Sequence, residues 1–331
     1  MSDIYPWQQD HWAQLQVRVA ARRLPHGLLF SGPAGLGKRA FAEAFAAALL
    51  CPQPQADGTA CGRCTACRLR LAGTHPDLLR IRPPEDKTQI GIDQIRELSQ
   101  SLSLKSHAGG YQIALLEPAE RMTTAAANSL LKTLEEPTDH TILVLVTEQP
   151  ARLPATVRSR CQTLRFPVPS PELAEGWLAE RCGGDPQLVL RLADGAPLRA
   201  LELAQSDTLT QRAVWIGQLL EVRRGRQDPT RVAADWFSDA LLRPLYWAGQ
   251  YLADAIRLRQ GGEVSLKNSD MLNNLQALAE SAAPAELHAA LERAWQHMRL
   301  AQQAGVNRQL LLEEFLIDWG RGGQQQRRQA R

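Results

Sequence analysis

The segment Gly32 to Arg39 constrains the fold of this 331-residue chain more than any other. It reads Gly-Pro-Ala-Gly-Leu-Gly-Lys-Arg, follows a short apolar run at 27–30 and precedes an alanine-rich stretch at 40–50. Glycines at this spacing let backbone N–H groups approach phosphate oxygens, and the lysine reaches the β- and γ-phosphates. The order of strand, loop and helix predicts a phosphate-binding loop. Its expected nucleotide-binding residues are Gly32, Gly35, Gly37 and Lys38.

The first half of the chain alternates short apolar runs with helical stretches, which predicts a parallel sheet with helices on its faces. Five strands are expected, near residues 27–30, 78–82, 112–116, 141–147 and 162–166. Between the third and fourth strands, the run Thr123 to Glu136 is rich in Ala and Leu and is followed by Pro137. Because proline ends a helix, this run predicts a helix that stops there.

A proline-rich break at 167–171 divides the chain, and Ser170 followed by Pro171 is a good helix start. We expect an α/β domain at 1–167, a small lid of short helices at 168–206, and an all-α domain at 207–331 that ends in a basic tail. In the last domain Leu287, Leu291, Trp295 and Met298 recur at helical spacing. Five of the eight tryptophans lie there, and they are predicted to be buried anchors of helix packing.

Composition excludes several classes of protein. Hydrophobic residues at 44% and charged residues at 22% are typical of a soluble globular chain rather than a disordered or fibrous one. No apolar run approaches the roughly 18 residues of a transmembrane helix, and no signal peptide opens the chain, so a cytoplasmic location is expected. The net charge of +3 is too small to indicate nucleic-acid binding, and the arginine-rich tail 321–331 is interpreted as solvated.

Four of the six cysteines, Cys51, Cys61, Cys64 and Cys67, fall within one short segment. Clustering of this kind in a chain without export signals favours a metal site over disulfides. A full set of four thiolates closes a tetrahedral Zn²⁺ shell and leaves no open position, so the predicted site is structural. Four unligated thiols and a DNA-reading zinc finger are the alternatives. Cys161 and Cys182 are interpreted as ordinary buried cysteines.

A phosphate loop followed by four cysteines before the second strand is similar to the clamp-loader branch of the AAA+ proteins. Three further motifs arrive in the order of that family, at 73–77 (Gly-Thr-His-Pro-Asp), 126–137 (Ala-Ala-Asn-Ser-Leu-Leu-Lys-Thr-Leu-Glu-Glu-Pro) and 153–161 (Leu-Pro-Ala-Thr-Val-Arg-Ser-Arg-Cys). The opening Tyr5-Pro6-Trp7 resembles the bacterial δ′ family of DNA polymerase III. The similarity covers about residues 5–205, and the last third matches weakly, best at 305–308.

Two positions separate the chain from the τ/γ motor subunits, which keep an intact loop and an Asp-Glu pair. Mg²⁺ binding requires a Ser or Thr hydroxyl where Arg39 stands. The Asp that holds metal and the Glu that activates water are replaced by Glu117 and Pro118, and proline offers no base. We therefore expect no intrinsic ATP hydrolysis. Binding of ATP or ADP without turnover remains open, because Lys38 and the glycines are kept.

The resemblance implies a RecA-like AAA+ domain with a parallel five-stranded sheet, a small helical lid and an all-α collar that builds a ring. It implies a stator-like accessory subunit of the DNA-directed DNA polymerase III holoenzyme, acting in DNA replication in the cytoplasm at the nucleoid. The implied partners are the τ/γ motor subunits, the δ subunit, the sliding clamp and, through the complex, primer-template DNA. An autonomous AAA+ ATPase and a zinc-dependent DNA-binding module are the alternative functions.

The resemblance also assigns roles to single residues. It makes Arg160 an arginine finger offered to a neighbour's ATP, with Arg158 as the alternative. Arg199 takes the place of the sensor 2 arginine, although a surface arginine is an alternative interpretation, and Thr147 falls in the sensor 1 region. Candidate contacts to DNA phosphates are Lys105, Arg121 and Lys132, for which simple solvation is the alternative.

Overall fold

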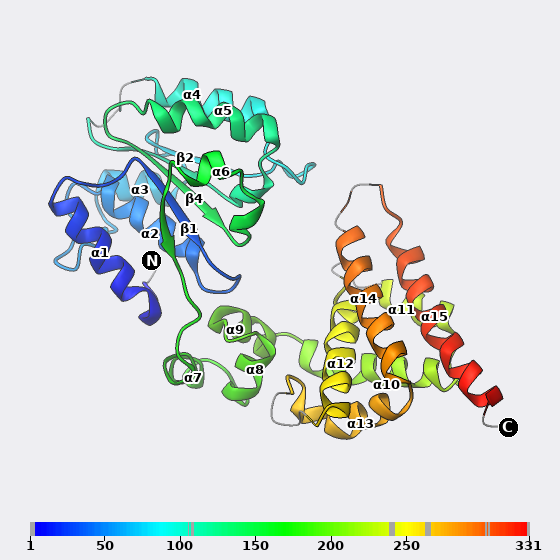
Figure 1. Ribbon diagram of the computed structural model, residues 1–331. Coiled ribbons are helices and arrows are strands. Elements are labelled where there is room, and N and C mark those ends of the chain that lie inside the picture. The colour runs from blue at the N-terminus through cyan, green and yellow to red at the C-terminus, as the bar shows by residue number, and fades with distance from the viewer. Residues whose placement is uncertain are drawn as a thin grey trace. The chain divides into compact units, whose positions relative to one another are not determined.

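The computed structural model of the chain describes residues 4–104, 106, 109–237, 242–261, 266–301, 303 and 305–329, with the backbone alone at 324–329 (Figure 1). The chain divides into two compact units, which are described separately below. The first contains residues 1–181 and 193–201, and the second contains residues 182–192 and 202–331. Among the described residues, no helix is both long and apolar enough to cross a bilayer.

The first unit is built on a parallel sheet in the order β2-β3-β4-β1-β5. The strands are β1 (Gly27–Ser31), β2 (Leu78–Ile81), β3 (Gln112–Leu116), β4 (Thr141–Thr147) and β5 (Gln162–Arg165). All five predicted strands are confirmed, and their ends differ from the prediction by at most one residue. Strand β1 lies between β4 and β5 and runs parallel to both, so the phosphate loop that follows it lies at the carboxyl edge of the sheet.

Both faces of the sheet are covered by helices (Figure 1). Successive side chains of a strand point to opposite faces, so Leu28 and Phe30 pack with one layer and Leu29 packs with the other. The first layer contains α1 (Gln9–Ala20) and α2 (Lys38–Leu50), and the second contains α4 (Ile92–Leu102) and α5 (Thr124–Glu135). This two-sided burial explains why the strands read as nearly continuous apolar runs.

Local signals set several helix ends as predicted. The Thr123 side chain accepts a hydrogen bond from the Ala126 N–H and caps α5, and the helix ends next to Pro137. Ser170 caps α7 (Pro171–Ala179) in the same way through the Leu173 N–H. Two more short helices follow, α8 (Pro186–Leu192) and α9 (Pro197–Gln205). The short helices expected between 168 and 206 are thus present, whereas the three-domain division itself stays a prediction.

The second unit is helical in all its described parts. Besides α8 and the last residues of α9, it contains α10 (Thr208–Arg223), α11 (Pro229–Phe237), α12 (Arg243–Arg259), α13 (Leu272–Glu280), α14 (Pro284–Leu300) and α15 (Arg308–Gln329). Four of its five tryptophans are buried as predicted, namely Trp215, Trp236, Trp247 and Trp319. Trp295 is half-buried instead, because its ring lies over the surface of Gly249 on α12. The predicted basic tail is not a separate segment, since α15 continues through it to Gln329.

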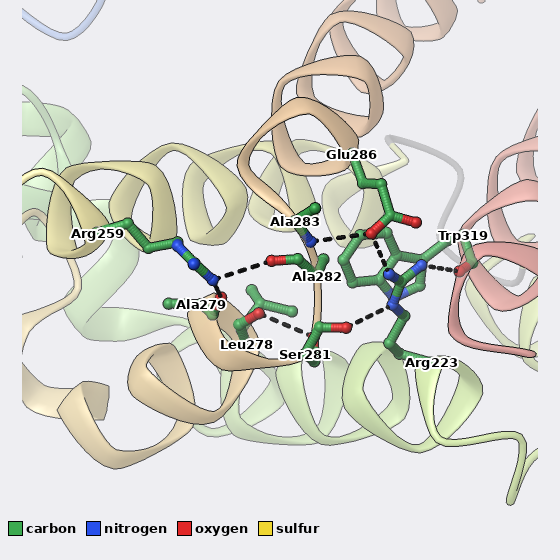
Figure 2. A network of polar contacts seen from close by, with 9 residues as sticks. All are labelled: Arg223, Arg259, Leu278, Ala279, Ser281, Ala282, Ala283, Glu286 and Trp319. Carbon is green, nitrogen blue, oxygen red and sulfur yellow. Dashed lines mark hydrogen bonds and ion pairs between the residues drawn. The ribbon is translucent and has the colours of Figure 1, made fainter. Parts of the chain in front are cut away.

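A buried arginine joins three helices of this unit (Figure 2). The Arg223 side chain is 3% exposed and donates to the Ser281 carbonyl (2.9 Å), the Trp319 carbonyl (3.0 Å) and the Glu286 carboxylate (2.8 Å). Its guanidinium also lies over the Trp319 ring, 4.6 Å from the centroid. Since an unpaired buried charge is costly, these contacts fix α10 against α15 and the α13–α14 turn.

Candidate functional site

The phosphate loop has the backbone that its glycines predict. Gly35 and Gly37 have φ values of 76° and 79°, in the left-handed region that side chains rarely adopt. A Cβ on Gly35 would lie 2.8 Å from the Arg199 Cβ, and one on Gly37 would lie 2.6 Å from the Tyr5 ring. Both glycines are therefore required by conformation and by close neighbours. Gly37 leads directly into α2, whose N-terminus favours anions.

Lys38 is held inside the loop. Its side chain donates from Nζ to the Pro33 carbonyl at 2.7 Å, and the residue is 4% exposed. Burial lowers the pKa of Lys38, while the nearby carboxylates of Glu148, Glu120 and Glu117 act in the opposite direction. The lysine thus lies among acidic groups on the β3 and β4 ends, as expected for a residue at the carboxyl edge of the sheet.

Arg39 and Glu117 form an ion pair. The Arg39 Nε lies 3.2 Å from Glu117 Oε2, and Arg82 approaches the same oxygen at 3.3 Å. Burial raises the pKa of Glu117, and the charges of the two arginines oppose that effect. The carboxylate expected at a metal site therefore contacts two guanidinium groups. A magnesium ion would have to displace them both.

Sequence reasoning missed two acidic residues close to this loop. Glu120 follows β3, and its Oε1 accepts a hydrogen bond from the Glu148 N–H, which follows β4 (3.2 Å). The other oxygen, Oε2 of Glu120, is buried and has no hydrogen-bond partner among the described residues. The only available signal was position, since residues that end neighbouring parallel strands meet at one edge of the sheet.

Aromatic side chains from two distant segments lie over the loop. The rings of Tyr5 and Trp7 are stacked at 5.0 Å, and Trp177 of α7 meets them edge-on at 5.7 and 5.2 Å. The Trp7 Nε1 and Gln8 Nε2 both donate to the Leu36 carbonyl, at 3.0 and 2.8 Å. The motif Tyr5-Pro6-Trp7 was noted from sequence only as a resemblance. Its contact with Trp177 comes from the tertiary structure.

Arg199 lies beside the phosphate loop. The preceding residue, Leu198, donates its N–H to the Gly35 carbonyl at 3.1 Å, which attaches the start of α9 to the loop. The Arg199 side chain is 37% exposed, and its Nη1 lies 3.9 Å from Asp194 Oδ2. The structure thus brings Arg199 together with the glycines and Lys38. A contact from Arg199 to a nucleotide stays a prediction.

Arg160 lies at the opposite edge of the sheet. It precedes β5, which pairs in parallel with β1 so that Gln162 is opposite Leu28. The phosphate loop begins only after Ser31, and four residues of strand span roughly 13 Å. Arg160 thus cannot reach the phosphates of its own loop without a large rearrangement. The side chain is 36% exposed and forms an ion pair with Glu135 at 2.5 Å.

Arg158, the alternative finger, is the last residue of the short helix α6 (Ala155–Arg158) and is exposed. Within the described residues its side chain makes no hydrogen bond or ion pair. Thr147, expected near the nucleotide, ends β4 and is buried, with its Oγ1 accepting a hydrogen bond from the Gln149 N–H (3.1 Å).

The four clustered cysteines converge as predicted. Their Sγ atoms all lie within 4.8 Å of one another, with Cys51 to Cys64 and Cys61 to Cys67 each at 3.9 Å. Bonds of about 2.3 Å in a tetrahedral Zn²⁺ site place sulfurs about 3.8 Å apart, so the cluster can hold a metal ion of this size. Cys64 also caps the helix α3 (Thr65–Leu71) through the Cys67 N–H.

The other two cysteines differ from each other. Cys161 is 8% exposed in the core beside Leu134 and Val157, and burial raises the pKa of its thiol to about 11. The prediction of an ordinary buried cysteine is confirmed there. Cys182 is half-buried, so the prediction is wrong for it, because the residue follows the end of α7 and precedes a glycine-containing turn.

Two of the three candidate contacts to DNA phosphates lie within the described residues, and both are exposed. Arg121 lies in a short 3₁₀ turn after β3, and Lys132 lies on α5. Lys105 lies outside the described residues. Exposure is compatible with both interpretations, a phosphate contact and simple solvation, so neither residue is assigned a role by its surroundings.

Two protein families match successive parts of the chain. Residues 7–170 match the family described as DNA polymerase III, delta subunit, and residues 206–321 match the family described as DNA polymerase III, delta subunit, C terminal. The chain is 38% identical to DNA polymerase III subunit delta′ of Pseudomonas aeruginosa, over 96% of this chain and 98% of that one. It belongs to the δ′ family of DNA polymerase III subunits.

Other relatives agree with membership of the δ′ family. DNA polymerase III subunit delta′ of Escherichia coli is 34% identical over 95% of this chain and 94% of that protein. DNA polymerase III subunit tau of Bacillus subtilis is 31% identical over 65% of this chain but only 38% of its own length. The resemblance to a clamp-loader AAA+ protein, and to δ′ rather than τ/γ, is thus confirmed. In this δ′ family member the parallel sheet and its phosphate loop lie in the first unit.

Proposed function

We propose that this δ′ family member is a non-hydrolysing, stator-like subunit of the DNA polymerase III clamp loader that stimulates ATP hydrolysis by a neighbouring motor subunit. The observation that carries this proposal is the pairing of Arg39 with Glu117 at the position where a hydrolysing site would hold Mg²⁺. Phosphoryl transfer of this type depends on a metal that bridges the β- and γ-phosphates. Pro118 adds a second defect, because it supplies no group that can activate water.

Arg160 would act across a subunit interface. Its place at the amino edge of the sheet, away from its own phosphate loop, agrees with a role in trans. A guanidinium set against the γ-phosphate of a neighbour stabilises the charge of the transition state, and such fingers contribute about 10³- to 10⁵-fold to the rate. The finger lets hydrolysis respond to assembly of the ring.

The remaining sites would be structural or would support assembly. Zn²⁺ held by Cys51, Cys61, Cys64 and Cys67 would stabilise the segment after α2, since four thiolates leave no open position for catalysis. The loop residues Gly32, Gly35, Gly37 and Lys38, with Arg199, would bind ATP or ADP at most without turnover. The all-α collar would join a ring with the τ/γ and δ subunits through heterologous interfaces.

The complex, rather than this chain alone, would open the sliding clamp and place it on primer-template DNA in the cytoplasm. Arg121 and Lys132 would meet DNA phosphates within the ring, since phosphate contacts require only positive charge. The chain would thus contribute to DNA-directed DNA synthesis as an accessory subunit.

The test is reconstitution of the loader from this chain, a motor subunit, its δ partner, the sliding clamp and primed DNA. We expect Arg160→Ala to lower the DNA-stimulated ATPase rate severely while the complex still assembles in gel filtration. Arg158→Ala is the matched control, since it removes a neighbouring exposed arginine and should leave the rate near that of the unmodified protein. An unchanged rate for Arg160→Ala would remove this residue from the mechanism and leave the chain a structural member of the ring.

A further inference from the structure

Glu135, the last residue of α5, contacts Arg160 directly. Its Oε1 lies 2.5 Å from the Arg160 Nη2, and the other terminal nitrogen, Nη1, donates to the Thr156 carbonyl at 2.9 Å. Two acceptors on two different nitrogens fix both the position and the plane of the guanidinium group. One contact alone would leave the side chain free to rotate about it.

The main chain holds these two residues in register. A Cβ on Gly27, the first residue of β1, would lie 3.0 Å from the Arg160 carbonyl oxygen and 3.1 Å from the Leu134 Cδ2. The preceding residue, His26, makes a ring-nitrogen hydrogen bond to the Leu134 carbonyl at 2.8 Å. The end of α5 and the segment that bears Arg160 are therefore both packed on the start of β1, which sets the distance between Glu135 and Arg160.

The guanidinium keeps donors for another ligand. Arginine has five N–H groups, and the contacts to Glu135 and Thr156 use two of them. The Arg160 side chain is 36% exposed, so the remaining donors can face solvent or a neighbouring subunit. A phosphate group accepts such hydrogen bonds best when the guanidinium is already oriented, because no rotamer has to be selected on binding.

We propose that Glu135 is a positioning residue for Arg160, and that it orients the guanidinium toward the terminal phosphate of a nucleotide bound by the neighbouring subunit. This inference rests on the proposed function in trans. Glu135 acts through Arg160 and does not itself touch the nucleotide. An exposed ion pair contributes little to folding, so loss of Glu135 should change turnover much more than stability.

A double-mutant cycle in the reconstituted loader tests this coupling. The variants are Glu135→Ala, Arg160→Ala and the double variant, with Glu136→Ala as the matched control. Glu136 is the next residue along the chain and is also exposed. Its N–H donates to the Lys132 carbonyl, but its side chain makes no hydrogen bond or ion pair within the described residues. For each variant, kcat and KM for ATP are measured with clamp and primed DNA, together with the urea midpoint of the free chain.

We expect Glu135→Ala to lower kcat about tenfold, because misplacing a catalytic group by about 1 Å is enough for losses of this size. KM for ATP and the urea midpoint should change little, and Glu136→Ala should match the unmodified protein. The double variant should be no slower than Arg160→Ala alone. Glu135→Gln, whose amide oxygen still accepts from Arg160, should restore most of the rate.

The outcomes separate this inference from the proposed function. A wild-type or faster rate for Glu135→Ala, or a loss that adds to that of Arg160→Ala, overturns the positioning role and leaves the finger in place. An unchanged rate for Arg160→Ala overturns both. If Glu135→Ala proves unstable, the cycle is repeated with Glu135→Gln, whose smaller loss must vanish when Arg160 is absent. A loss that persists there overturns the inference.

Discussion

The Arg39 side chain contacts the Glu117 carboxylate, the group that a metal ion at the phosphate loop would need. Replacement by threonine restores a hydroxyl ligand and frees Glu117 from one of its two arginines. We expect Arg39→Thr to bind ATP at least about tenfold more tightly with Mg²⁺ than with a chelator, a difference of about 1.4 kcal/mol. Calorimetric titration of the variant and the unmodified chain, each with and without chelator, measures this difference.

The same variant tests the role of Pro118. Arg39→Thr should still release no phosphate above background, since no base follows Glu117. Steady turnover by either protein, abolished by Lys38→Ala, would show an autonomous ATPase and contradict the non-hydrolysing role.

We expect His297 to make the stability of the second unit depend on pH. Burial lowers the pKa of His297, whereas Glu314 and the Leu311 carbonyl act in the opposite direction. As the pH falls below about 6.5, His297 therefore takes up a proton in the unfolded chain at a higher pH than in the folded protein. The contribution of neutral His297 to the free energy of unfolding is therefore complete above this pH. It is lost as the pH falls toward the lower pKa that His297 has in the folded protein. The urea midpoint of this unit should fall between pH 7.5 and pH 5.5, and by less in His297→Gln. An equal fall in both proteins would exclude His297 as the cause.

At the scale of an element, the segment 51–74 is expected to depend on its metal. It contains one short helix, α3, and two of its four expected ligands are half-buried. The Trp12 side chain ties it to α1 through the Asp57 carbonyl, and the metal would join its two ends. Protein purified without added zinc should contain about one Zn²⁺ per chain by metal analysis. Cys64→Ser should reduce this content and expose the segment to protease, whereas Cys182→Ser should do neither. Absence of metal in the unmodified protein would contradict the assignment.

The junction of α10, α13, α14 and α15 depends on Arg223 in the same way (Figure 2). Arg223→Met removes these three hydrogen bonds and with them the ion pair to Glu286, whose carboxylate keeps the hydrogen bond from the Ala283 N–H. Because breaking a buried pair is strongly destabilising, we expect a loss of about 3 kcal/mol in the free energy of unfolding. The control is Arg224→Met, which removes a 44% exposed side chain paired with Glu221 and should cost less than about 0.5 kcal/mol. Similar urea midpoints for the two variants would contradict this role.

For the whole molecule, the two compact units each have a hydrophobic core of their own. Chains of this kind depart from two-state unfolding, so calorimetry should resolve two transitions. Removal of zinc should lower only the transition temperature of the unit that contains Cys51. Arg223→Met should lower only the transition temperature of the other unit. A single transition moved equally by both changes would show that the units unfold together.

Sequence alone determined the elements and the family. Apolar runs predicted all five strands, and the glycines predicted the phosphate loop. The run from Thr123 to Pro137 predicted the ends of α5. The cysteine spacing predicted the cluster of four thiols that could hold a metal ion. These features depend on neighbours in the chain, because strand periodicity, helix caps and left-handed turns are short-range effects. The order of motifs indicated the clamp-loader branch, and Arg39 with Glu117-Pro118 distinguished the δ′ family from the motor subunits.

Only the tertiary structure decided which distant side chains meet. Arg39 with Glu117, Trp177 with Trp7, and Arg160 with Glu135 are separated by many residues and carry no local signal of their pairing. The two ion pairs follow from the order of strands in the sheet, which fixes the places of the residues that flank β1, β3, β4 and β5. The two tryptophans meet where α7 packs against the 3₁₀ turn at Pro6–Gln8. Glu120 was missed for the same reason. The charged groups of a site can be identified from the sequence. Their partners, and therefore the chemistry of the site, depend on long-range packing.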